Sequence, residues 1–138
     1  MDWIIDWQLK RRNISKTQKD YLDGKRYRHG KRKAGGSGAN QHTEQPGKNY
    51  QVARTTSERI ATESGVSEKT VRINAKFSEA IDAIGVNAGP EVKAKILSGK
   101  SGLSKKDVME VAALPAAKQA VAIREKKDQR RTRPRQPA

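Results

Sequence analysis

Residues 55–84 read TTSERIATESGVSEKTVRINAKFSEAIDAI, and this stretch decides the fold because it predicts two helices joined by a tight turn. The first helix, expected over residues 56–64, opens with hydroxyl side chains that can accept hydrogen bonds from its free amide groups. Gly65 stands where a helix ends in a left-handed conformation. Ser67 is then a suitable N-cap for a second helix that begins at Glu68.

The small and apolar residues of this stretch have the spacing of a helix-turn-helix. Ala61, a small residue, stands where the two helices must cross closely, and Gly65 follows four residues later at the turn. Val66 and Val71 supply apolar contacts behind the turn. Such a pair places its second helix in the major groove of DNA. The alternative interpretation is an ordinary helical hairpin with a glycine turn.

The second helix has a polar and partly basic outer face. We expect Val71, Ala75 and Ile81 to point inward. The residues left facing outward are then Ser67, Glu68, Lys69, Arg72 and Lys76. Arginine and lysine can read guanine edges, serine and threonine can contact bases or phosphates, and glutamate can accept a hydrogen bond from cytosine. The pattern therefore favours a helix that reads bases.

The formal net charge of +15 at pH 7 is unevenly distributed along the 138 residues. Residues 51–88 hold five basic and five acidic side chains and are neutral. Residues 1–33 hold eleven basic and four acidic side chains, a net +7, and residues 123–138 hold seven and two, a net +5. A neutral reading unit between basic flanks suits a protein whose flanks neutralise phosphates while a central helix reads bases.

Composition excludes several other classes of protein. Apolar residues make up only 33% of the chain, and no run approaches the roughly 18 apolar residues of a membrane span, so we expect no membrane partner. The start of the chain does not resemble a secretion signal, which favours a cytoplasmic, nucleoid-associated protein. Cysteine is absent, and His29 and His42 have no partners at metal-ligand spacing, so we expect no metal. With no catalytic constellation either, we expect a protein that is not an enzyme.

The chain is expected to be all-α, a helix-turn-helix within a small multi-helix domain with a flexible linker and a basic disordered C-terminal tail. Residues 1–30 form a helical N-terminal segment, whose helix over residues 16–28 is weakened by Gly24 by roughly 1 kcal/mol relative to alanine. Residues 31–50, rich in glycine and amide side chains, form the linker. Residues 51–124 form the DNA-binding domain, and residues 125–138 form the tail.

Three further helices are expected after the helix-turn-helix. A break at residues 85–89 precedes Pro90, which opens one helix, and Ser104 with Asp107 forms a capping box at the start of the next. The last helix follows Pro115. The residues expected to pack inward in these helices are Val92, Ile96, Leu97, Val108, Val111, Ala112, Leu114, Ala117, Ala120, Val121 and Ile123.

Three stretches together resemble the ParB-type partition proteins, including the phage and mobile-element branch of that family. QLKRRNIS at residues 8–15 is similar to the family segment ENxQRxxLxP, which ends its amino-terminal domain. RIATESGVSEKTVR at residues 59–72 is the helix-turn-helix. ILSGKSGLSKKDVMEVAALPAAKQAVA at residues 96–122 is similar to the downstream helices that complete the family's DNA-binding domain.

The resemblance implies the DNA-binding portion of that family alone. The family's nucleotide-binding domain lies upstream of the first motif, where this chain begins, and only Arg11 matches the motif's polar residues. We therefore carry over neither CTP binding nor CTP hydrolysis and expect no cofactor. Without that domain, Trp3, Ile4 and Trp7 would either pack on the helical domain or form a self-association patch.

The sequence thus predicts a ParB-like protein that binds double-stranded DNA sequence-specifically, reading the major groove with the helix that starts at Ser67. Its role would be partition or maintenance of a mobile element, or transcriptional regulation, with a homodimer as a candidate assembly. The expected DNA-binding residues are Thr55, Thr56, Ser57, Ser67, Glu68, Lys69, Thr70, Arg72, Lys76, Lys93, Lys95, Lys100, Lys105 and Lys106.

Two other functions fit the sequence. A basic RNA-binding or ribosome-associated protein would use the helix-turn-helix only for packing, and its bases would stack on exposed aromatic side chains. An adaptor would instead dock on a protein partner through Trp3, Ile4 and Trp7.

Overall fold

The computed structural model describes residues 2–11, 13–34 and 55–132. Across these residues the chain forms helices and no strand, which confirms the all-α prediction. The helices are α1 (Asp2–Leu9), α2 (Lys16–Ala34), α3 (Thr56–Ser64), α4 (Glu68–Ala88), α5 (Pro90–Leu97), α6 (Lys105–Ala112) and α7 (Ala116–Thr132). Residues 31–34, which we expected to begin the linker, are instead the last turn of α2. The rest of the expected linker, from residue 35 on and with His42, and the expected tail from residue 133 on lie outside the described residues.

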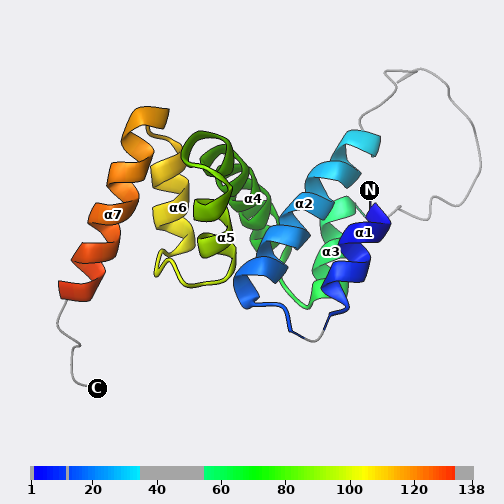
Figure 1. Cartoon of the computed structure of the whole chain (residues 1–138). Coiled ribbons are helices and arrows are strands. Elements are labelled where there is room, and N and C mark those ends of the chain that lie inside the picture. Colours follow the sequence, from blue (N-terminus) through cyan, green and yellow to red (C-terminus); the bar gives the residue numbers. More distant parts are fainter. Residues whose placement is uncertain (1, 12, 35–54, 133–138) are drawn as a thin grey trace, which may run out of the picture.

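Helix α4 lies at the centre, with α2 and α3 on one side and α5, α6 and α7 on the other (Figure 1). The contact between α2 and α4 is the most extensive of the described helix pairs. Residues 1–30 are therefore not a separate unit, because α1 and α2 share the main core with α4, α5 and α6. That core consists of Ile5, Tyr21, Leu22, Phe77, Ala80, Ile81, Ile84, Ile96, Val108 and Val111.

Gly24 lies where α2 crosses α4. A Cβ atom at this position would overlap the backbone carbonyl group of Asn74. Only glycine therefore lets the two helices approach this closely. The cost of glycine within a helix, which the sequence suggested as a weakness of α2, is offset here by the docking of α2 on α4.

The polar side chains at this crossing are paired with each other. Asn74 donates a hydrogen bond from Nδ2 to Oδ1 of Asp20, over 3.3 Å. Lys105 of α6 donates from Nζ to Oδ1 of Asn74, over 2.7 Å, and lies 2.8 Å from Oδ2 of Asp20. These contacts join α2, α4 and α6, and they hold Lys105 inside the domain.

A second polar cluster centres on Asp82 of α4. Tyr21 donates from its hydroxyl to Oδ1 of Asp82 over 2.6 Å, and Lys93 of α5 donates to the same oxygen over 2.7 Å. Burial alone would raise the pKa of Asp82, but the hydrogen bonds from Lys93 and Tyr21 and the charges of Lys25 and Lys93 lower it below its usual value. Lys93 is therefore held between α4 and α5.

Helix α4 is longer than the sequence indicated. The predicted break at residues 85–89 is wrong, because α4 continues to Ala88 and ends at Gly89, whose φ is 98°. Ile84 is buried and Ala88 packs against the core, and these contacts hold the last turn in place. The prediction that Pro90 opens the next helix is confirmed, since it is the first residue of α5.

Helix α7 continues beyond residue 124, where we expected helical structure to end. It runs to Thr132 because Lys126 and Arg130, four residues apart on one face, reach acidic side chains of α6. Lys126 Nζ lies 2.6 Å from Glu110 Oε2, and Arg130 Nη2 lies 2.7 Å from Asp107 Oδ2. The prediction of disorder is therefore wrong for residues 125–132.

The contact between α6 and α7 uses other residues than the sequence predicted. The predicted core residue Leu114 is exposed, as are Ala117, Ala120 and Val121 on the outer face of α7. Gln119 is buried instead and donates to the backbone carbonyl of Leu114 over 2.9 Å and to that of Ala112, the last residue of α6, over 3.4 Å. The other predicted inward positions of α5–α7 are buried or half-buried.

At the start of the chain, α1 turns Ile5 towards the core and leaves two tryptophans outside. Trp3 is 71% exposed and Trp7 is 56% exposed, and the Arg11 guanidinium lies over the Trp7 ring at 4.2 Å from its centroid. Packing of these tryptophans into the helical domain is therefore excluded. Self-association through them stays a prediction.

Candidate nucleic-acid interface

The ends of α3 and α4 are fixed by local hydrogen bonds. Thr55 and Glu58 form a capping box at the start of α3, and Gly65 ends this helix with a φ of 69°. The Ser67 hydroxyl accepts a hydrogen bond from the backbone amide of Thr70 at the start of α4. These ends confirm the predicted first helix at residues 56–64 and the predicted start of the second at Glu68.

Apolar and polar contacts lock α3 against α4. Ile60, Ala61 and Val71 form a small buried cluster, against which Val66 packs as predicted and Tyr27 of α2 packs as well. The two helices therefore keep a fixed relative position. This rigidity suits a helix pair that presents one face to a partner.

One hydrogen bond crosses between the starts of the two helices. Ser57 is 4% exposed, and its Oγ donates to Oε2 of Glu68 over 2.9 Å. Glu68 Oε2 also accepts from Arg72 over 3.3 Å. Ser57 and Glu68 thus hold the helix pair together. Of the three hydroxyl residues expected to meet a phosphate, Thr55 is exposed, Thr56 half-buried and Ser57 buried.

The outer face of α4 is polar with one apolar residue in its middle. Four exposed residues share one face of this helix: Lys69, Arg72, Ile73 and Lys76. Arg72 and Ile73 each lie three or four positions from both lysines, and residues with that spacing lie on the same side of a helix. Together with Glu68 they line a shallow depression. Ser67 is exposed and Thr70 half-buried at the start of this face.

A second groove runs between α2 and α4. Its α2 side consists of Tyr27, Arg28 and Lys31, and its α4 side consists of Arg72, Ala75, Lys76 and Glu79. Four cations and one carboxylate line it, so the groove is basic. The sequence did not point to the α2 residues of this groove. Tyr27, Arg28 and Lys31 lie within about one helical turn of each other, but nothing in the neighbouring sequence indicates that they lie beside Arg72.

The remaining predicted cations lie on the α5–α6 half of the molecule. Lys95, Lys100 and Lys106 are exposed, whereas Lys93 and Lys105 are half-buried in the ion pairs with Asp82 and Asp20. None of these five lysines lines the depression on α4 or the groove between α2 and α4. The structure therefore brings together Lys69, Arg72 and Lys76 and leaves the downstream lysines apart from them.

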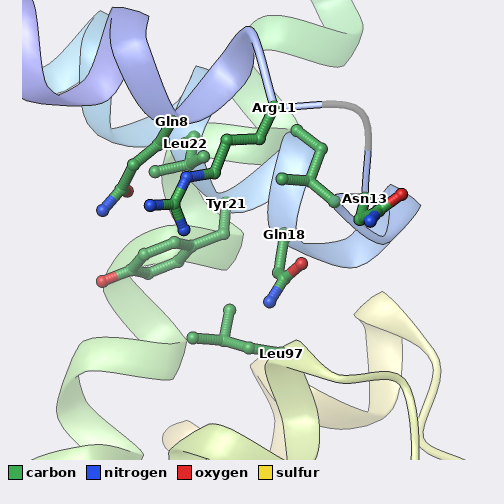
Figure 2. A pocket seen from close by; sticks show the side chains of 8 residues that line it. Gln8, Arg11, Asn13, Gln18, Tyr21, Leu22 and Leu97 are labelled. Atoms are coloured by element: carbon green, nitrogen blue, oxygen red, sulfur yellow. The ribbon is translucent and has the colours of Figure 1, made fainter.

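A third depression lies between the α1–α2 connection and the end of α5 (Figure 2). Gln8, Arg11 and Leu22 lie on one side of it and Leu97 on the other, with Tyr21 between them. The amide of Gln18 already accepts a hydrogen bond from the Ser15 amide, and Ser15 donates to the Leu97 carbonyl over 2.8 Å. These bonds fix the connection against α5, so the depression follows from the docking of α1 and α2.

Within residues 2–11, 13–34 and 55–132, no helix is long and apolar enough to cross a membrane. The same residues contain no group of three histidine, cysteine or acidic side chains placed to hold a metal ion. None of the protein-family models matches this chain, and no curated protein or solved structure matches it significantly.

Proposed function

We propose that this protein binds double-stranded DNA sequence-specifically and reads the major groove with α4. The observation that carries the proposal is the exposed face of Lys69, Arg72, Ile73 and Lys76 on a helix whose start is fixed by a capped glycine turn. Lysine and arginine recognise guanine edges, and an aliphatic side chain contacts the thymine methyl group. This face therefore carries chemistry suited to both polar and apolar features of base edges.

The distribution of charge supports the same proposal. The stretch of residues 51–88 is neutral, while the flanks hold the excess of positive charge. A protein that gains its affinity from phosphates and its specificity from bases needs this division. The exposed cations Lys95, Lys100 and Lys106 are candidates for backbone contacts.

The resemblance to ParB-type partition proteins adds a biological role to the proposal. In such a protein, α5, α6 and α7 would brace the reading helix, as the packing of α4 against them allows. The role would be partition or maintenance of a mobile element, or transcriptional regulation, in the cytoplasm and on the nucleoid.

Replacing Arg72 with alanine tests the base-reading assignment. The Arg72→Ala variant should lose discrimination between the preferred duplex and an unrelated one by about 1–3 kcal/mol, because the replaced guanidinium reads a base. Lys127→Ala, which removes an exposed cation of α7, should weaken binding to both duplexes by the same factor. Equal losses for both duplexes in both variants, measured by fluorescence anisotropy, would contradict the assignment.

The alternative of RNA binding depends on exposed aromatic side chains. Trp3 and Trp7 are exposed, but they lie on α1, and no residue of α1 lines the depression on α4 or the groove between α2 and α4. Tyr21 is buried and Tyr27 is half-buried. Competition of a labelled duplex with structured RNA separates the two functions.

A further inference from the structure

We propose that the C-terminal part of α2 is a second DNA-contacting element, and that the groove between α2 and α4 holds a backbone phosphate beside the base-reading face. This inference rests on the proposed function. Lys31 of α2 and Lys76 of α4 would bind the phosphate from opposite sides of the groove. Three features of the groove support this proposal: its charge, the fixed backbone of its α2 side and its position relative to α4.

The charge of the groove is not fully neutralised by its own residues. Arg28 Nη1 lies 3.2 Å from Asp82 Oδ2, so the charge of Arg28 is partly balanced by that carboxylate. Lys31, three residues further along α2, is exposed and forms no ion pair with another described residue. On the α4 side, Lys76 is exposed as well, and Glu79 is the one acidic residue of the lining. An anion entering the groove would therefore meet two lysines.

The groove is also rigid. Upstream, Gly24 brings α2 into close contact with the backbone of α4. Gly30, within the α2 side of the groove, lies against Thr56 at the start of α3, where a Cβ atom would come within 2.6 Å of the threonine Cγ2. The backbone of this end of α2, cyan in Figure 1, is thus held by contacts with α4 and with α3. Arg28 and Lys31 therefore stand on a fixed backbone beside α4.

The position of the groove indicates a phosphate of the DNA backbone. Arg72 and Lys76 belong both to the groove and to the exposed face of α4. A helix that lies in the major groove has a row of phosphates on either side, and the element packed beside it meets one of those rows. The end of α2 is such an element, so Lys31 lies where a phosphate of the read sequence is expected.

The test compares Lys31→Gln with Lys16→Gln. Lys16 is an exposed lysine at the other end of the same helix, roughly 22 Å away at 1.5 Å per residue, so its replacement removes the same charge outside the groove. Lys31→Gln should weaken binding to the preferred duplex and to an unrelated duplex by the same factor. It should also make the negative slope of log K against log salt shallower by about 0.9, the value of one phosphate contact. Lys16→Gln should leave that slope unchanged.

Duplexes that each carry one uncharged methylphosphonate identify the phosphate itself. One substitution beside the preferred sequence should weaken binding by the wild type and should weaken binding by Lys31→Gln less, because only Lys76 then remains to bind that phosphate. Additive losses, or the same slope for wild type and Lys31→Gln, would overturn the inference while leaving base reading by α4 in place. A wild type that shows no preference among duplexes would contradict the proposed function instead. Circular dichroism of both variants checks that the helices are retained.

Discussion

Gly24 shows how one residue sets the distance between two helices. In isolation, glycine destabilises a helix by about 1 kcal/mol relative to alanine, so Gly24→Ala should strengthen α2. In the folded protein, the added methyl group would overlap the Asn74 carbonyl and force α2 away from α4. The main core depends on that contact, since Tyr21 and Leu22 reach it from α2.

Gly24→Ala is therefore expected to lower the free energy of unfolding by about 1–3 kcal/mol, as overpacking does in a close-packed interior. The measurement is urea denaturation followed by circular dichroism. Gly85→Ala is the comparison, because Gly85 also lies within a helix but its Cβ would meet a side chain, 2.8 Å from Cδ of Lys93, and not the backbone of another helix. Its effect should be smaller than that of Gly24→Ala, because a side chain can move aside more easily than a helix backbone. Stabilisation of similar size in both variants would contradict the proposed role of Gly24.

Ile73 is the second residue whose position makes a sharp prediction. It is 37% exposed among Lys69, Arg72 and Lys76, where an aliphatic side chain can contact a thymine methyl group. Replacing one thymine of the preferred duplex with uracil removes that methyl. Binding by the wild type should weaken about fourfold, the equivalent of about 0.8 kcal/mol for one buried methyl group.

The Ile73→Ala variant should bind the thymine and uracil duplexes equally, and its fold should be unchanged. If no thymine-to-uracil change affects the wild type, or if Ile73→Ala keeps the difference, Ile73 does not contact the methyl group. Either result leaves the test of Arg72 unaffected.

At the scale of elements, ion pairs connect the end of α7 to α6. The Ser104 hydroxyl and backbone amide donate hydrogen bonds to Asp107, and Lys126 and Arg130 reach the same carboxylate from α7. Together these contacts lower the pKa of Asp107 from 3.8 to about 2. Asp107 therefore connects the start of α6 to the end of α7.

The lowered pKa predicts a specific loss of stability in acid. A carboxyl whose pKa is lower when folded contributes stability that is fully present above the unfolded value near 3.8 and is lost as the pH falls towards 2. The free energy of unfolding of Asp107→Asn should therefore decline less than that of the wild type between pH 4 and pH 2. Urea denaturation at half-unit pH steps measures this. Parallel profiles for the two proteins would show that the contacts of Asp107 with Ser104, Lys126 and Arg130 do not stabilise its charged carboxyl.

The elements also show which parts of the fold a sequence can reveal. The bounds of α3 and the start of α4 were predicted correctly because their signals are local: a hydroxyl cap, a glycine in a left-handed conformation and a second cap. The role of Gly24 and the inward positions of Lys93 and Lys105 were missed. Their partners lie on other helices, so no local pattern reports them. The extension of α7 was missed for the same reason, since its ion pairs are with α6.

At the scale of the whole molecule, the candidate site was predicted in part. Lys69, Arg72 and Lys76 face outward from α4 as expected, because the buried positions Val71, Ala75 and Ile81 fix the orientation of the helix. The basic groove was not predicted, because it exists only where α2 docks beside α4. Residues 27–31, which span the end of the predicted N-terminal segment and the start of the predicted linker, thus supply one wall of the proposed interface.

The central claim is that α4 reads double-stranded DNA, and selection from a mixed random pool of duplex DNA and structured RNA tests it most directly. We expect the wild type to enrich one short duplex consensus and Arg72→Ala to enrich a consensus that has lost its preference at one base pair. A palindromic consensus would in addition indicate a homodimer, because the symmetry of the site mirrors that of the protein. Enrichment of RNA, or of duplexes without a consensus, would contradict the account.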